Sequence, residues 1–109
     1  MKNNNNDYIE GLKAGTVLTG FYLQAGSTKE YFFVTERKNK TAGLASAVLA
    51  ALQLPDVARL QAEIIYYLRP ACCRVKKAGK KYYFDISGDN FGGYGSDDIN
   101  DGKTVIITL

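Results

Sequence analysis

Residues 16–37 read TVLTGFYLQAGSTKEYFFVTER, and this stretch decides the fold because it predicts two strands joined by a short turn. Residues 16–24 and 29–37 are rich in Val, Thr, Tyr and Phe, which favour strands. Residues 25–28, Ala-Gly-Ser-Thr, are turn-forming types. Both segments carry apolar residues on each face, as Phe21 and Tyr22 illustrate. We therefore expect a hairpin in a sheet that is covered on one face and partly covered on the other.

A first helix is expected from Thr41 to about Gln53. Thr41 can cap its N-terminus, and the apolar stripe contains Leu44, Val48, Ala51 and Leu52. No residue from 41 to 53 is charged, so the helix is either buried or docked on a partner. Burial against the sheet is the simpler interpretation.

A second helix is expected from Pro55, which suits a first helical turn, to just before Pro70. Its apolar stripe is formed by Val57, Leu60, Ile64, Ile65 and Leu68. The segment 63–68, Glu-Ile-Ile-Tyr-Tyr-Leu, also has strong strand character. Helix and strand both remain open for these six residues, although the spacing of the apolar positions favours a helix.

Residues 74–84 read RVKKAGKKYYF and predict a second hairpin, with its turn at Ala78-Gly79. A Gly-rich polar loop is expected over 87–101, and a last strand over 103–109. The fold class is thus α+β: an antiparallel sheet of about five strands, in the order ββ-αα-βββ, with two helices packed on one face. We expect a single domain over residues 1–109, in which residues 1–7 form a polar, flexible tail.

The charges are segregated along the chain, although the formal net charge is only +3. Residues 69–81 hold six of the 14 basic side chains and no acidic one. Residues 85–101 hold five Asp and no basic side chain. The second hairpin is therefore expected to be cationic, and the loop that follows it anionic.

The composition argues against several kinds of chemistry. The chain has no His, the commonest general base and metal ligand in proteins. Cys72 and Cys73 are adjacent, which disfavours a disulfide between them and indicates a reducing, cytoplasmic setting. The 15 uncharged residues from Thr41 to Pro55 are too few to cross a bilayer, so no membrane contact is expected.

One segment comes close to an ion-binding motif. Residues 92–100 match a single copy of the Gly-Gly-x-Gly-x-Asp nonapeptide of calcium β-rolls. Calcium in that architecture lies between successive copies, so one copy predicts no site. We expect no cofactor and no metal, although ion binding by this loop stays open.

Two functional interpretations from different classes follow. A third, an enzyme that relies on Tyr, Lys, Asp or Cys alone, has the least support. The first is a non-enzymatic module that binds another protein, or a second copy of itself, with the profile of an inhibitor or accessory protein of a mobile element. Its expected partner-binding residues are Arg74, Lys76, Lys77, Lys80, Lys81, Tyr82, Tyr94, Asp97 and Asp98. The alternative is a single-stranded nucleic-acid-binding module in which the same cations contact phosphates. Tyr82, together with Tyr22 or Tyr31, would then stack on bases.

Overall fold

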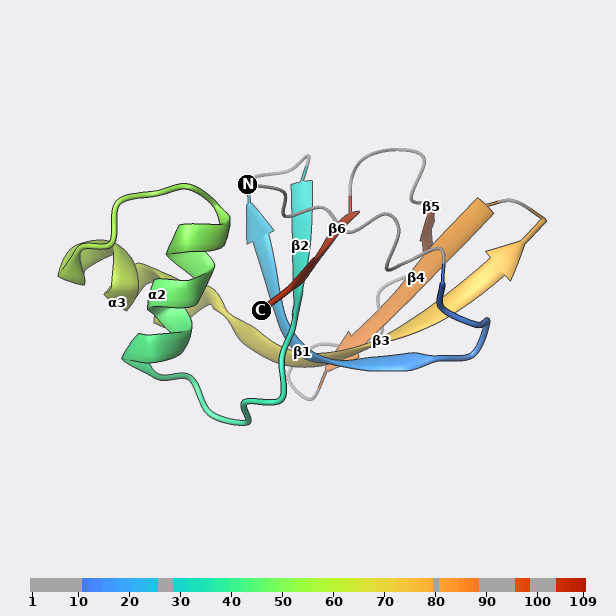
Figure 1. The fold of residues 1–109 in the computed structure, drawn as a ribbon, viewed down its shortest axis with the longest axis horizontal. Helices are drawn as coiled ribbons and strands as arrows, with labels where there is room; N and C mark the ends of the chain where they lie inside the picture. Colours follow the sequence, from blue (N-terminus) through green and yellow to red (C-terminus); the bar gives the residue numbers. More distant parts are fainter. Residues whose placement is uncertain (1–10, 26–28, 80, 89–95, 99–103) are drawn as a thin grey trace.

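The computed structural model describes residues 11–25, 29–79, 81–88, 96–98 and 104–109. The expected α+β class is confirmed: within these residues one sheet is combined with two helices, and the helices and the hairpin of residues 69–88 lie at opposite ends of the molecule (Figure 1). The expected tail over residues 1–7 lies outside the described residues. In chain order the elements are β1 (Val17–Ala25), β2 (Lys29–Val34), α2 (Ala42–Ala51), α3 (Ala58–Tyr67), β3 (Arg69–Ala78), β4 (Lys81–Gly88), β5 (Ser96–Asp98) and β6 (Thr104–Thr108).

The sheet is mixed, so the expectation of a purely antiparallel sheet was wrong. Its strand order is β5-β4-β3-β1-β2-β6, and β6 runs parallel to β2, with Glu30 opposite Thr104 and Phe32 opposite Ile106. The burial of Ile106 and Ile107 on opposite faces explains why β6 lies beside β2, although it is compatible with either strand direction. The edge of β2 is a position at which both faces of an added strand are covered.

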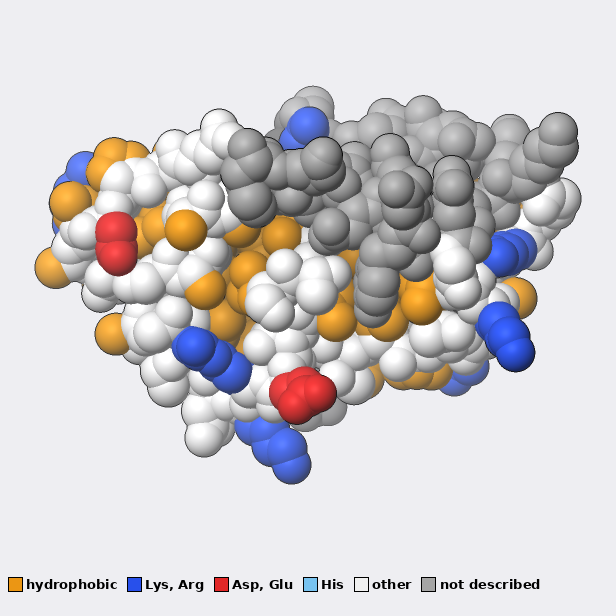
Figure 2. Space-filling model, in the orientation of Figure 1, with side chains coloured by type: hydrophobic (Ala, Val, Ile, Leu, Met, Phe, Trp, Pro, Cys, Tyr) orange, Lys and Arg blue, Asp and Glu red, His pale blue; other side chains and the backbone are white. Residues whose placement is uncertain are grey.

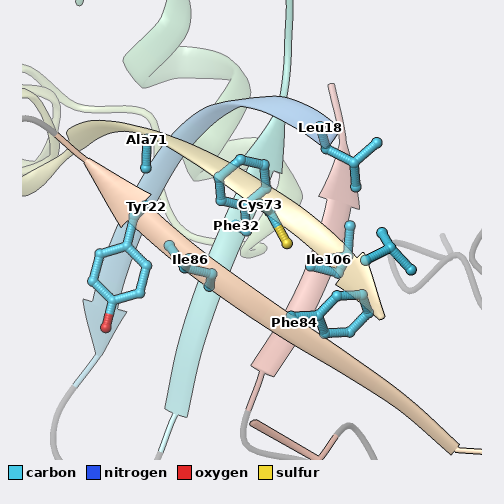
Figure 3. Close-up of a cluster of buried hydrophobic side chains, with 9 residues drawn as sticks. Leu18, Tyr22, Phe32, Ala71, Cys73, Phe84, Ile86 and Ile106 are labelled. Carbon is cyan, nitrogen blue, oxygen red and sulfur yellow. The ribbon is translucent and has the colours of Figure 1, made fainter. Parts of the chain in front are cut away.

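The sheet curls around a first hydrophobic core, which we call the inner core. It brings together side chains from the two ends of the strand order, so that Phe84 on β4 lies close to Ile106 on β6 (Figure 3). Its buried members are Leu18, Tyr22, Phe32, Ala71, Cys73, Val75, Phe84, Ile86 and Ile106. The inner core therefore holds the two hairpins to each other.

The second core, the outer core, lies on the opposite face of the sheet beneath the helices. Leu44 and Val48 of α2 pack there with Phe21, Phe33 and Ile107 of the strands. Thr41 caps α2 as expected, accepting a hydrogen bond from the backbone N–H of Leu44 at 3.2 Å. The uncharged helix is thus buried against the sheet, as its composition favoured.

Segment 63–68 belongs largely to a helix, because α3 continues to Tyr67. The start expected at Pro55 was wrong, because Val57 has an extended backbone (φ −122°, ψ 155°) and α3 begins only at Ala58. Asp56 accepts a hydrogen bond from Gln61 at 2.6 Å, whereas Val57 provides no side-chain cap. No residue within α3 is fully buried, so this helix lies at the periphery of the outer core.

Candidate functional site

The basic segment forms the predicted hairpin between β3 and β4. Ala78 is paired with Lys81, and Gly79 occupies the left-handed region with φ +66°, which glycine adopts without strain. Lys80 lies outside the described residues. Figure 2 shows Lys and Arg side chains at the end of the molecule where β3 and β4 project away from the helices.

Strand alternation divides the cations of β3 between two faces. Arg74 and Lys76 are exposed on the outer face, whereas Cys73 and Val75 point into the inner core. Lys77 follows Val75 by two residues and therefore shares the inner-core face rather than the face of Arg74. Arg74 and Lys76 therefore lie on one face of β3 and Lys77 on the other, although all three were expected to form one surface.

The outer face of the hairpin carries charges of both signs. Asp85 on β4 is the cross-strand neighbour of Arg74, and its Oδ2 lies 3.2 Å from the Nζ of Lys76. Tyr83 is the cross-strand neighbour of Lys76 and is half-buried. Both members of the ion pair remain substantially exposed, so the pair contributes little to stability and leaves its charges accessible to solvent.

The acidic segment is not wholly a loop, because β5 forms within the stretch 87–101 and pairs antiparallel with β4. Asp98 is paired with Tyr83, and Asp97 with Phe84. The backbone of this Asp-rich segment therefore runs along the edge of the basic hairpin. The side chains of Lys81, Tyr82, Asp97 and Asp98 and the whole of Tyr94 lie outside what the structure describes.

A shallow hollow of about 490 Å³ adjoins this outer face. Arg37 and Lys38 line one side, and Cys72 of β3 and Ser87 of β4 line the other. The sequence analysis did not select Arg37 and Lys38. The signal available was a pair of consecutive cations in the connection between β2 and α2, which follows β2 with Thr35 and Glu36. We define the docking face as the outer side of β3 and β4 together with this hollow.

Of the two described tyrosines proposed for base stacking, one is buried and the other is half-buried. Tyr22 is only 2% exposed and belongs to the inner core. Tyr31 packs against Phe33, with ring centroids 6.0 Å apart, at the margin of the outer core. The expectation that Tyr22 offers a stacking surface was therefore wrong, because its alternation with Phe21 places it on the inner face.

The two cysteines are free thiols in different environments. Cys72 is exposed in the docking face, whereas Cys73 is fully buried in the inner core. Burial, followed by the negative charge of Asp85 and the neighbouring Cys72, raises the pKa of Cys73 to about 12. Cys73 thus remains a neutral, inert thiol at physiological pH.

Among the described residues, no group of three or more His, Cys, Asp or Glu side chains is arranged to hold a metal ion. The helices of the described part of the chain are too short or too polar to span a bilayer. Comparison with protein-family models, curated proteins and solved structures finds no match. The function is therefore argued from the geometry and charge of the docking face.

Proposed function

We propose that this chain is a non-enzymatic protein-binding module that holds a segment of a partner protein, with both acidic and basic side chains, against the docking face. An accessory or inhibitory role in a reducing, cytoplasmic setting belongs to the same proposal. The observation that carries it is the exposed row of Arg74 and Lys76 on β3, flanked by Asp85 on β4 and by the Asp-rich β5 beyond it. Charges of opposite sign in neighbouring strands favour a partner with its own matching pattern.

The same pattern argues against the nucleic-acid alternative. Single strands of nucleic acid carry a uniform row of negative charges, which Asp85 and the Asp97–Asp98 segment would repel. Binding of such strands also relies on exposed aromatic rings near the cations, and of the rings proposed for stacking Tyr22 is buried and Tyr31 packs against Phe33. The hollow instead offers a mixture of hydroxyl, thiol and charged groups suited to an extended peptide, from Thr19, Thr35, Glu36, Arg37, Cys72 and Ser87.

The test compares two anionic probes on the same protein by fluorescence anisotropy. One is a labelled twelve-residue peptide with Glu and Thr in one half and Lys and Thr in the other, and the other is a twelve-nucleotide oligo(dT). We expect the peptide to bind more tightly than the oligonucleotide, and binding of the peptide to weaken as salt is raised. Tighter binding of oligo(dT) would favour the nucleic-acid alternative over protein binding. Binding of neither probe at low salt would contradict the proposal that the docking face is a binding surface.

A pair of variants with equal charge locates the binding. Arg74→Glu with Lys76→Glu should weaken peptide binding by about tenfold or more, because each reversal replaces an attraction of ~1 kcal/mol by a repulsion. Lys29→Glu with Arg59→Glu changes the net charge equally, at exposed positions on β2 and α3. Equal loss in both double variants would show that only net charge matters and would contradict a defined face.

Asp97→Asn with Asp98→Asn separates the two functional classes further. A protein partner that matches both signs should bind this variant less well, whereas oligo(dT) should bind it equally well or better. An improvement for both kinds of partner would contradict the protein-binding proposal.

A further inference from the structure

The exposed side of α3 is unusually apolar for a peripheral helix. Tyr66 and Tyr67 are 75% and 57% exposed, and their rings meet edge to face with centroids 4.9 Å apart. Leu54 and Val57, just before the helix, are each 45% exposed. Figure 2 shows hydrophobic side chains gathered at this end of the molecule, over α2 and α3. Clustered exposed side chains of this kind are typical of an interaction surface.

Two charges lie within the same exposed side. Arg59 and Glu63 are exposed and are one helical turn apart, about 6 Å along the axis. Neither forms an ion pair with any part of the chain that the structure describes. Ala58 and Ala62 are the remaining exposed residues of α3, and they are small enough for a second helix to approach closely.

We propose that this side of α3 binds the same side of a second copy of the chain, with the two α3 helices antiparallel about a two-fold axis. An axis level with residue 61 places Arg59 of each copy beside Glu63 of the other, so the two charges of each copy are both paired. The same antiparallel arrangement places the helix end that carries Tyr66 and Tyr67 level with the end of the other helix that follows Leu54 and Val57. Charge self-complementarity is the feature that selects a second copy over an unrelated partner. This surface is separate from the docking face, so the inference does not depend on the proposed function.

The size of the surface predicts a weak dimer. A ten-residue helix is about 15 Å long, so the interface falls below the ~1,200 Å² typical of stable complexes. In sedimentation equilibrium, the apparent mass should therefore rise from 12.0 kDa toward twice that value as the concentration is raised into the millimolar range. A single-chain mass throughout that range would overturn the proposal.

Charge reversal tests the pairing directly. Arg59→Glu and Glu63→Arg should each abolish self-association, because like charges then face each other across the axis. An equimolar mixture of the two variants should associate again. In the mixed dimer the introduced carboxylate of one variant meets the introduced guanidinium of the other, and the native Glu63 of the first meets the native Arg59 of the second. Failure of the mixture to associate, while the unaltered chain dimerises, would overturn the proposed register.

Two control measurements accompany these variants. Circular dichroism of each variant establishes that the fold persists, which is expected because both positions are exposed. Lys29→Glu lowers the charge as Arg59→Glu does but lies on β2, and it should leave self-association unchanged within about twofold. Loss of association in Lys29→Glu would assign the contact to another surface and overturn the proposal.

Discussion

Gly20 lies near the middle of β1, where the β2 backbone leaves no room for a Cβ, and replacing it with Ala should severely destabilise the fold. A Cβ at this position would lie 1.8 Å from the backbone oxygen of Phe33 and 2.9 Å from its carbonyl carbon. Real Cβ atoms essentially never come closer than 3.0 Å to another heavy atom, so the strands would have to separate by more than an ångström. The atom in the way belongs to the backbone, and no side-chain rotation relieves the overlap.

The cost follows from what the separation disrupts. The hydrogen bond from the Thr35 N–H to the Thr19 carbonyl, at 3.2 Å, would be lost, along with adjacent bonds of the β1–β2 ladder. Each lost bond costs about 1 kcal/mol, and the overpacking itself costs ~1–3 kcal/mol. We therefore expect Gly20→Ala to lower the free energy of unfolding by about 3–5 kcal/mol, a large share of the 5–15 kcal/mol typical of a domain.

Urea unfolding followed by circular dichroism measures this loss, which corresponds to a fall in the midpoint of about 2 M or more. Gly43→Ala is the matched control, because its Cβ would meet only the end of the flexible Arg37 side chain, at 3.0 Å. That substitution should be neutral or stabilising by up to ~1 kcal/mol, since Ala favours a helix over Gly. A loss below about 1 kcal/mol for Gly20→Ala would refute the close approach of β1 and β2.

The remaining predictions concern the thiols, a helix cap and an ion pair. A thiol reagent such as DTNB should modify only Cys72 in the native chain and both cysteines in urea, and native modification of two thiols would contradict the burial of Cys73. Burial raises the folded-state pKa of Cys73 from 9.0 to about 12. The contribution of the neutral thiol to the free energy of unfolding should therefore be fully present below pH 9, and it should fall by up to ~1.4 kcal/mol per pH unit from there to about pH 12. Cys73→Val should flatten this alkaline loss in urea titrations, and an unchanged loss would assign it to other groups. Thr41→Ala should lower the free energy of unfolding by about 1 kcal/mol through loss of the α2 cap, and no change would show that the cap bond at 3.2 Å is dispensable. Lys76→Met should change the free energy of unfolding by less than about 1 kcal/mol, and a larger loss would show that the pair with Asp85 is more than a surface contact.

Local features of the fold could be predicted from the sequence because neighbouring residues determine them. The two hairpins follow from strand-forming runs joined by turn residues, and the Thr41 cap follows from residue type and spacing. The parallel pairing of β6 with β2 could not be predicted, because alternation in residues 103–109 specifies a strand but not its neighbour or direction. Pro55 misled the prediction of where α3 begins, since Pro suits a connecting segment as well as a first helical turn.

The candidate site was only partly predictable. The sequence placed Arg74, Lys76 and Lys77 together, but the alternation of β3 puts Lys77 on the other face. Arg37 contributes to the hollow only because the connection after β2 folds back toward β3, a long-range feature that local sequence does not contain. Segment 96–98 has little strand propensity, and β5 forms there as a short edge strand on β4.

The β2–β6 ladder also has a consequence for how the chain is made. Glu30 and its neighbour Thr104 are 74 positions apart, so β2 leaves the ribosome long before the strand that covers its edge. During that interval the β2 backbone has an open edge next to Phe32 and Phe33, which are both fully buried in the finished fold. Closing so long a loop is slow, and neither hydrophobic core is complete until it includes Ile106 or Ile107 of β6. The nascent chain therefore passes through a period in which this open edge and its apolar side chains are exposed to aggregation.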